Sequence, residues 1–523
     1  GGNNVAVGKS ALQENTTGAE NTAIGTDAMC ANTTGGSNVA VGRCALLSNT
    51  TAGQNTAVGR DTLCTNTTGA NNTALGFRAL RSNTEGNSNI AIGYHAMCTN
   101  TTGSVNLAMG FCAMESNTTG TSNTAIGANA LETNTTGTDN TVVGRSAMAK
   151  NTTGLCNTSM GGNALACNTT GCYNTAHGRD ALCANTTANH NTAVGVSALK
   201  VNTTGACNTA IGYESLRSNT TAHHGVAVGY EALDANTTPN GNVAVGFRAA
   251  KSNVTGSSIT AVGHCALNAN TGNNNTALGF DALKVNQGGA CNTAVGNLAL
   301  AANSSASNNT AFGYQTLCAS TTANFNTAVG MEAGMSVTTG SQNTFLGFRA
   351  GDLNTTGCCN TAVGTNAMGA NTTADNNTAV GHSALIANTT GCQNTAVGLS
   401  SMFTNTTGCQ NVAMGRQSLH DNTTGKCNVA LGYNSLFNNE TADNNTAVGT
   451  HALFANTTGA ANTAVGFDAL KASTTSAYNS AFGSYALDAN TTGAKNVGIG
   501  FNAAGGNTTG SDNVAVGQNA LRC

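Results

Sequence analysis

The residues of this sequence that could do chemistry are its cysteines, its histidines and a recurrent Asn-Thr-Thr turn. The chain of 523 residues contains 19 Cys, and several of them fall at repeated offsets along the sequence. The candidate disulfide pairs are Cys30 with Cys44, Cys98 with Cys112, and Cys392 with Cys409. Such pairs could form disulfides in an oxidising compartment, or they could remain small unpaired side chains.

The Asn-Thr-Thr turns match the acceptor pattern for N-linked glycosylation. The first candidate acceptors are Asn15, Asn32, Asn49, Asn66 and Asn100. A structural interpretation stands beside the chemical one. Asn at a fixed turn can stack into a ladder of amides, while Thr side chains bond to the local backbone.

The nine His residues are scattered and do not form a recognisable ligand pattern. No Cys-x-x-Cys motif is paired with a second one, and no phosphate-binding glycine loop occurs. No nucleophile, base and acid can be assembled into a set either. We therefore expect no catalytic residues, no metal site and no cofactor, and we predict that the chain is not an enzyme.

The elements that position these residues come from one internal repeat. The string Asn-Thr-Ala-Val-Gly, with variants, recurs every 17 residues and gives 31 units, with one residue missing at Asn270-Thr271-Gly272. We number the leading Asn of each unit position 0. Position 4 is Gly in every unit, beginning with Gly8, Gly25, Gly42, Gly59 and Gly76. Such uniformity indicates a backbone requirement, either a positive φ or a contact too close for a Cβ atom.

Composition and periodicity together predict the fold class. Only 8% of residues are charged and 4% aromatic, which is too few for ordinary globular domains. Positions 1 to 3 are short and often β-branched, as in a strand, whereas positions 5 to 10 fit a second strand or a short helical turn. We predict an all-β protein, a β-solenoid of about 31 coils that forms a single continuous domain over residues 1–523.

The choice of residues within the strand predicts how the coils pack. Positions 1 and 3 share one face, and the exchange of Thr for Leu at Leu107 indicates that this face is covered. Position 2 is nearly always Ala, which indicates packing against the opposite wall or another chain. Large apolar residues occur mainly at positions 3 and 8, so one coil has a thin core. We therefore expect lateral self-association, as a parallel homotrimer or a filament.

Two strings carry a family resemblance. Asn38-Val39-Ala40-Val41-Gly42 and Asn89-Ile90-Ala91-Ile92-Gly93 resemble the repeats of trimeric autotransporter adhesin heads. The whole unit, for example residues 123–137, is similar to repeats of phage tail-fibre and related surface-fibre proteins, although the coil is longer than in the adhesin heads. The resemblance covers the entire chain. It implies an oligomeric β-solenoid in an extracellular, cell-surface or virion-associated fibre.

The remaining expectations concern partners and function. The formal net charge of −3 gives no electrostatic reason for binding nucleic acid, and no apolar run is long enough for a membrane span. The first hypothesis is a structural or adhesive fibre that contacts itself, laterally or end to end, and an unidentified surface receptor or glycan. The alternative is an ice-binding repeat protein, which needs a flat and uninterrupted row of exposed Thr. The chain does not begin with Met, and we expect either a longer parent protein or end-to-end stacking.

Overall fold

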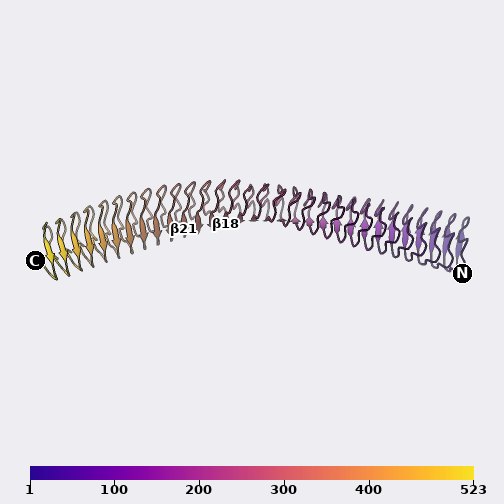
Figure 1. The fold of residues 1–523 in the computed structure, drawn as a ribbon, viewed down its shortest axis with the longest axis horizontal. Helices are drawn as coiled ribbons and strands as arrows, with labels where there is room; N and C mark the ends of the chain where they lie inside the picture. Colours follow the sequence, from indigo (N-terminus) through magenta and orange to yellow (C-terminus); the bar gives the residue numbers. More distant parts are fainter. Residues whose placement is uncertain (523) are drawn as a thin grey trace. The chain divides into compact units, whose positions relative to one another are not determined.

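The structure is a computed structural model that describes residues 1–522, and it divides into two compact units, Gly1–Ile259 and Thr260–Cys523. Each unit is a stack of coils in which a three-residue β-strand recurs once per coil (Figure 1). Within the described residues there is no helix, and hence none that could cross a membrane. The prediction of an all-β solenoid of about 31 coils is confirmed, and the single continuous domain stays a prediction.

The strands of the first unit are β1 (Val5–Val7), β2 (Thr22–Ile24), β3 (Val39–Val41), β4 (Thr56–Val58), β5 (Thr73–Leu75), β6 (Ile90–Ile92), β7 (Leu107–Met109), β8 (Thr124–Ile126), β9 (Thr141–Val143), β10 (Thr158–Met160), β11 (Thr175–His177), β12 (Thr192–Val194), β13 (Thr209–Ile211), β14 (Val226–Val228) and β15 (Val243–Val245). Those of the second unit are β16 (Thr260–Val262), β17 (Thr276–Leu278), β18 (Thr293–Val295), β19 (Thr310–Phe312), β20 (Thr327–Val329), β21 (Thr344–Leu346), β22 (Thr361–Val363), β23 (Thr378–Val380), β24 (Thr395–Val397), β25 (Val412–Met414), β26 (Val429–Leu431), β27 (Thr446–Val448), β28 (Thr463–Val465), β29 (Ser480–Phe482), β30 (Val497–Ile499) and β31 (Val514–Val516).

Within each unit, successive strands pair in parallel and in register, so that every residue lies beside its equivalent in the next coil. Val5 pairs with Thr22, for example, 17 residues later. The missing residue shortens this step to 16 between β16 and β17, where Thr260 pairs with Thr276. The turn absorbs the deletion, because Asn270 Nδ2 donates to the carbonyl oxygen of Gly272, 2.8 Å away and two residues on.

The interior of the coil is lined by position 2 of the strand and by positions 7 and 8 of the facing wall. Ala40, Ala45 and Leu46 are fully buried, whereas Ile24 and Leu75, both at position 3, are 39% and 46% exposed. Position 2 therefore packs against the opposite wall, one of the two alternatives expected. The prediction that position 3 belongs to the core of the coil is wrong. A three-residue strand directs only its middle side chain inward, and a small Ala there lets the two walls approach closely.

Positions 5 to 10 form consecutive turns, neither the strand nor the helical turn that the sequence suggested. The amide of Ala28 donates to the carbonyl of Gly25 (3.3 Å), and the amide of Met29 donates to Ala45 of the next coil (2.9 Å). Positions 6 and 8 have left-handed backbones, as in Asp27 (φ 60°) and Met29 (φ 48°). A left-handed Met or Leu costs about 1–2 kcal/mol. Complete burial of the Met29 side chain and the bond to the next coil offset that cost.

The position-4 glycines meet both conditions that their uniformity suggested. Gly8, Gly25, Gly42, Gly59 and Gly76 have φ between 129° and 138°. A Cβ atom on Gly25 would also lie 2.5 Å from the carbonyl oxygen of Gly42. A Cβ atom at position 14, as on Gly18, would also lie close to the carbonyl oxygen of the next coil. Position 14 is nevertheless less restricted, because its backbone lies outside the left-handed region and Ala52 takes the place of Gly there.

This difference predicts unequal effects of two substitutions in one coil. A Cβ atom would lie 2.5 Å from a carbonyl oxygen of the next coil at both Gly144, position 4, and Gly154, position 14. Only Gly144 also has a left-handed backbone (φ 139°), whereas position 14 accepts Ala in other coils, as at Ala52. We expect Gly144→Ala to lower the free energy of unfolding by about 1–3 kcal/mol. Gly154→Ala, at position 14, should lower it by less than about 1 kcal/mol. Urea unfolding followed by circular dichroism measures both, and equal effects would contradict the interpretation of position 4.

Candidate interaction surface

Two rows of asparagine side chains, at positions 0 and 11, run through the interior of each unit. Asn21 Nδ2 and Asn32 Nδ2 both donate to the carbonyl oxygen of Gly35, at 2.9 and 3.0 Å. Asn32 Nδ2 also donates to Asn15 Oδ1 of the preceding coil (2.8 Å), and the amide of Asn38 donates to Asn21 Oδ1 (3.0 Å). Each side-chain amide thus joins its own turn to a neighbouring coil.

The candidate glycosylation residues belong to the position-11 row. Asn32, Asn49, Asn66 and Asn100 are fully buried, and Asn15 is half-buried. Their Nδ2 atoms, where a glycan would attach, point into the coil and donate hydrogen bonds. At the four buried residues the folded coil offers no accessible acceptor nitrogen. The geometry therefore favours the amide-ladder interpretation of the Asn-Thr-Thr turns.

The threonines of the same turns reinforce the stacking. Thr16 Oγ1 donates to the carbonyl oxygen of Thr33, 2.9 Å away, and Thr33 Oγ1 donates in turn to Thr50 (3.0 Å). These bonds join adjacent coils, whereas the sequence suggested bonds to the local backbone. Both polar residues of the turn therefore hold one coil against the next.

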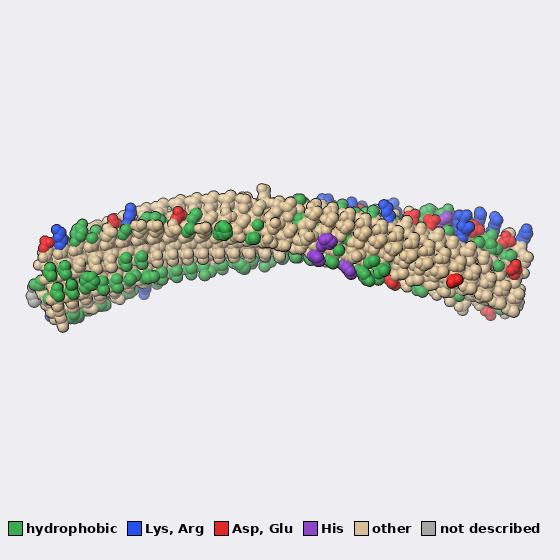
Figure 2. Space-filling model, in the orientation of Figure 1, with side chains coloured by type: hydrophobic (Ala, Val, Ile, Leu, Met, Phe, Trp, Pro, Cys, Tyr) green, Lys and Arg blue, Asp and Glu red, His purple; other side chains and the backbone are tan. Residues whose placement is uncertain are grey.

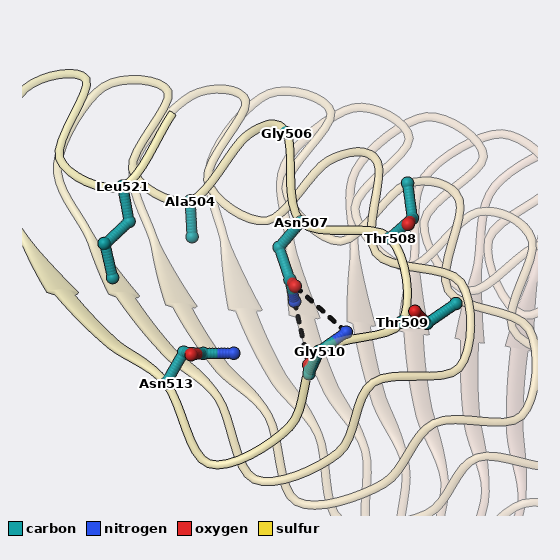
Figure 3. A pocket seen from close by; sticks show the side chains of 8 residues that line it. All are labelled: Ala504, Gly506, Asn507, Thr508, Thr509, Gly510, Asn513 and Leu521. Atoms are coloured by element: carbon teal, nitrogen blue, oxygen red, sulfur yellow. Dashed lines mark hydrogen bonds between the residues drawn. The ribbon is translucent and has the colours of Figure 1, made fainter. Parts of the chain in front are cut away.

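A close view of one turn shows how the amide row is built (Figure 3). Asn507 Nδ2 donates to the carbonyl oxygen of Gly510 (3.0 Å), and the Gly510 amide donates back to Asn507 Oδ1 (3.1 Å). Ala504, Asn513 and Leu521 line the same hollow, which is the interior of the coil. Polar turn and apolar wall therefore share one narrow interior.

The ladder is interrupted where serine replaces asparagine. Ser320 and Ser473 occupy position 11, and the Oδ1 atoms of Asn303 and Asn456 in the preceding coils are buried without a hydrogen-bond partner. A serine side chain is too short to supply the missing N–H. These coils were visible in the sequence as exceptions to Asn-Thr-Thr, but their significance depends on knowing that the amides face inward.

The cysteines predicted at equal positions of adjacent coils lie together. Cys392 Sγ and Cys409 Sγ, both at position 15, are 3.3 Å apart, and Cys392 donates to Cys409. Adjacent coils separated by about one strand spacing place such Cα atoms within disulfide range. The contact that Cys30 makes is with a glutamine, since its Sγ donates to Gln13 Oε1 of the preceding coil at 3.9 Å.

Cys44, Cys64, Cys98 and Cys112 lie on the turn wall, which carries the variable positions 5, 6, 9 and 10 of each coil. On this wall, position 9 of one coil neighbours position 6 of the next or the preceding coil. Cys98 and Cys112 are buried. Burial, with the Glu115 carboxylate and a smaller effect of Cys98, raises the pKa of Cys112 to about 12. The pKa of Cys64 is raised mainly by burial and also by Cys44, so Cys44 lies near Cys64, a cysteine neighbour that the sequence offsets did not suggest.

The most extensive exposed feature is the outer strand face, which we define as positions 1 and 3 of the strands. None of the 31 strands carries Asp, Glu, Lys or Arg at either position. Large apolar side chains are exposed there, among them Met109 (41%), Phe312 (42%) and Leu346 (46%). Figure 2 shows part of this face as a band of apolar surface along the unit Thr260–Cys523. Exposed apolar surface of this extent is typical of an interaction site.

The size of the outer strand face fits a stable interface. A three-residue strand is about 10 Å long and the strands are about 4.8 Å apart, so each strand contributes about 50 Å². The 16 strands of the unit Thr260–Cys523 then present about 800 Å². A standard protein interface buries about that area on each partner.

The turn wall presents a different surface, at the variable positions 5, 6, 9 and 10. Phe77, Tyr94 and Phe111 stack along it with ring centroids 5.4 and 5.2 Å apart, and the Arg78 guanidinium lies 4.9 Å from the Phe77 ring centre. Tyr94 is 46% exposed and Phe111 55%. Aromatic and basic side chains thus form a continuous exposed strip over these coils.

Comparison with protein-family models and with curated protein sequences gives no match for this chain. The functional argument therefore depends on the surfaces just described.

The amide ladder predicts opposite effects for its removal and its repair. Asn134 Nδ2 donates to Asn117 Oδ1 (2.8 Å) and to the Gly137 carbonyl (3.1 Å), and Asn134 Oδ1 accepts from Asn151 Nδ2 (2.8 Å). Asn134→Ala should lower the free energy of unfolding by about 1–3 kcal/mol, because buried polar partners lose their bonds. Urea unfolding measures the change.

The converse experiment combines Ser473→Asn with Ser476→Gly. The first change supplies a donor to Asn456 Oδ1 and an acceptor for Asn490 Nδ2, and the second removes the hydroxyl that Asn490 Nδ2 now contacts at 3.4 Å. We expect the free energy of unfolding to rise by about 1 kcal/mol. No gain from the repaired ladder would show that the amide rows do not stabilise the stack.

The sulfur contact predicts one readily formed disulfide. Oxidised glutathione should convert the thiols of Cys392 and Cys409 to a disulfide with release of two molecules of reduced glutathione. Alkylation of the remaining thiols, followed by peptide mass mapping without reduction, should recover the linked peptide. Cys392→Ser serves as the control. Full alkylation of both cysteines after oxidation would contradict the prediction.

Proposed function

We propose that this protein is a structural and adhesive fibre module that associates laterally with further copies of itself. The observation that carries the proposal is the outer strand face, which lacks Asp, Glu, Lys and Arg in every strand and exposes large apolar side chains. The resemblance to surface-fibre repeats points in the same direction. The proposal includes an extracellular, cell-surface or virion location and no enzymatic activity.

A second copy of the chain is the partner that this face fits best. Identical coils have identical spacing, so two outer strand faces match row against row over their whole length. Because positions 1 and 3 lack Asp, Glu, Lys and Arg, two such faces meet without repulsion between like charges. The area available is sufficient for a stable interface. A parallel homotrimer and a filament are both compatible with this contact.

The turn wall would then face outward from the assembly and meet other partners. The stacked rings of Phe77, Tyr94 and Phe111, with Arg78 beside them, offer apolar faces and a cation to a surface receptor or a glycan. Its residues vary from coil to coil. Residues that vary from coil to coil are better suited to recognising a partner than to stacking identical coils.

One observation favours the second candidate, ice binding. Position 1 is Thr in nine consecutive strands, from β16 at Thr260 to β24 at Thr395, and the structure orients this position outward. A flat row of outward Thr is the feature that ice binding needs. Ice and a second copy would compete for the same surface, so a single set of variants separates the two functions.

The test places charge on the outer strand face. Val363→Lys with Val380→Lys should shift the mass in multi-angle light scattering from a multiple of 51.7 kDa toward that value, because buried unpaired charges oppose association. The matched control is Thr365→Lys with His382→Lys at position 5, which should leave the oligomer intact.

A wild-type protein that is monomeric at micromolar concentration would overturn the self-association. Thermal hysteresis in that monomer, abolished by the two lysines on the outer face, would establish the ice-binding alternative. We expect a stable oligomer and no thermal hysteresis.

A further inference from the structure

We propose that His264, Cys265 and Asp281 form a binding site for a divalent transition metal ion of the zinc type. The site lies on the turn wall of the unit Thr260–Cys523. One nitrogen of His264, Cys265 Sγ and one carboxylate oxygen of Asp281 all lie within 4.8 Å of one another. The inference goes beyond the proposed fibre function and does not depend on it.

The repeat places the three ligands together. His264 and Cys265 occupy positions 5 and 6 of one coil, and Asp281 occupies position 6 of the next. The backbone amide of Asp281 donates to the carbonyl of His264 (3.0 Å), which fixes the two coils against each other at this point. The Phe280 ring stacks on the His264 imidazole, with centroids 5.0 Å apart and planes 13° from parallel. The imidazole is therefore held by packing as well as by its backbone.

The Asp281 carboxylate gives an independent indication that a cation binds here. The residue is only 8% exposed, and its Oδ1 atom is buried without a hydrogen-bond partner. Its Oδ2 atom pairs with Lys284 Nζ at 2.9 Å. A buried carboxylate oxygen without a partner is energetically unfavourable, and a bound cation would satisfy it.

The ligand types select the ion. Zinc binds His nitrogen, Cys sulfur and carboxylate oxygen at about 2.0–2.3 Å in a tetrahedron, so its ligand atoms lie about 3.3–3.8 Å apart. The three atoms already lie within 4.8 Å of one another, and changes in side-chain torsion angles would bring them to that geometry. A thiolate and an imidazole do not suit Mg²⁺ or Ca²⁺, which prefer oxygen ligands. Water would occupy the fourth position, on the exposed side of His264, and the Cys265 thiol proton would leave to solvent.

The chain contains a natural near-match to this site. Arg43, Cys44 and Asp61 occupy the same three positions in an earlier pair of coils, with an arginine in place of the histidine. Sequence motifs did not reveal the site because its ligands come from two coils, and only the stacking brings them together.

The experiment titrates the reduced full-length chain with Co²⁺ alone and records the sulfur-to-cobalt charge-transfer absorption. We expect one site of high affinity, and Zn²⁺ should displace the Co²⁺. His264→Arg should weaken that site at least tenfold, as should Asp281→Asn. Arg43→His should add a second site of the same spectrum, because it completes the equivalent set of ligands.

His264→Arg decides the question even if other variants fold poorly, since the fold already accepts Arg43 at the equivalent position. Circular dichroism before the titration checks that the coils are intact. Equal Co²⁺ stoichiometry and affinity in the wild type and His264→Arg would overturn the proposal, because the cobalt would then be bound by other cysteines. Absence of a charge-transfer band in the wild type would overturn it as well.

Discussion

Within each unit, every residue lies beside its own equivalent in the adjacent coil, about 4.8 Å away, and the rest of the structure follows from this stacking. A side chain is accepted at a position only if it tolerates a neighbour at the same position. Position 4 tolerates no side chain at all, because a Cβ on Gly25 would meet the Gly42 carbonyl. Asparagine suits the interior because its amide both donates and accepts. Asn49 donates to Asn32 and accepts from Asn66, whereas a row of aspartates would provide acceptors only.

The same constraint accounts for the unusual composition. An interior lined by Ala, Ala and Leu accommodates a large aromatic side chain only where the facing residues are small, as at the buried Phe345, whose ring lies against Gly334 and Gly351. Rows of equal charge would repel one another along the stack. Most charged residues therefore occur on the turn wall, where opposite signs meet in adjacent coils at several points. Arg217 Nε lies 2.9 Å from Asp234 Oδ1, and Arg349 Nε lies 2.6 Å from Glu332 Oε2. A charged fraction of 8% thus reflects how few positions can accommodate a charge.

The period, the strand at positions 1 to 3 and the glycine requirement at position 4 could all be predicted, because each repeats in nearly every coil. Which face of the strand points into the coil could not be predicted. Thr and Val fit either a covered or an exposed face, and Ala at position 2 indicated packing without saying against what. The turn wall was hidden for another reason. Its left-handed positions, such as Asp27 and Met29, carry ordinary residues whose conformation is imposed by burial and by bonds to the next coil. Without that geometry, neither the proximity of Cys44 to Cys64 nor the cluster around Asp281 could be deduced from spacing.

In the consensus coil, the buried polar groups form hydrogen bonds within the stack. Function must therefore come from the surfaces that stacking leaves exposed. The outer strand face is left over in every coil, and variation along its position-1 row bears on the partner. Thr73 is followed by Ile90 and Leu107 in successive strands, with Ile90 41% exposed. Binding to the lattice of ice needs the same side chain at position 1 of every strand. A second copy of the chain carries the same substitutions and accommodates them by complementary packing. In the first unit this variation favours a protein partner over ice. Local chemistry, such as the sulfur pair of Cys392 and Cys409, arises where two adjacent coils both depart from the consensus with side chains that can react or bind together.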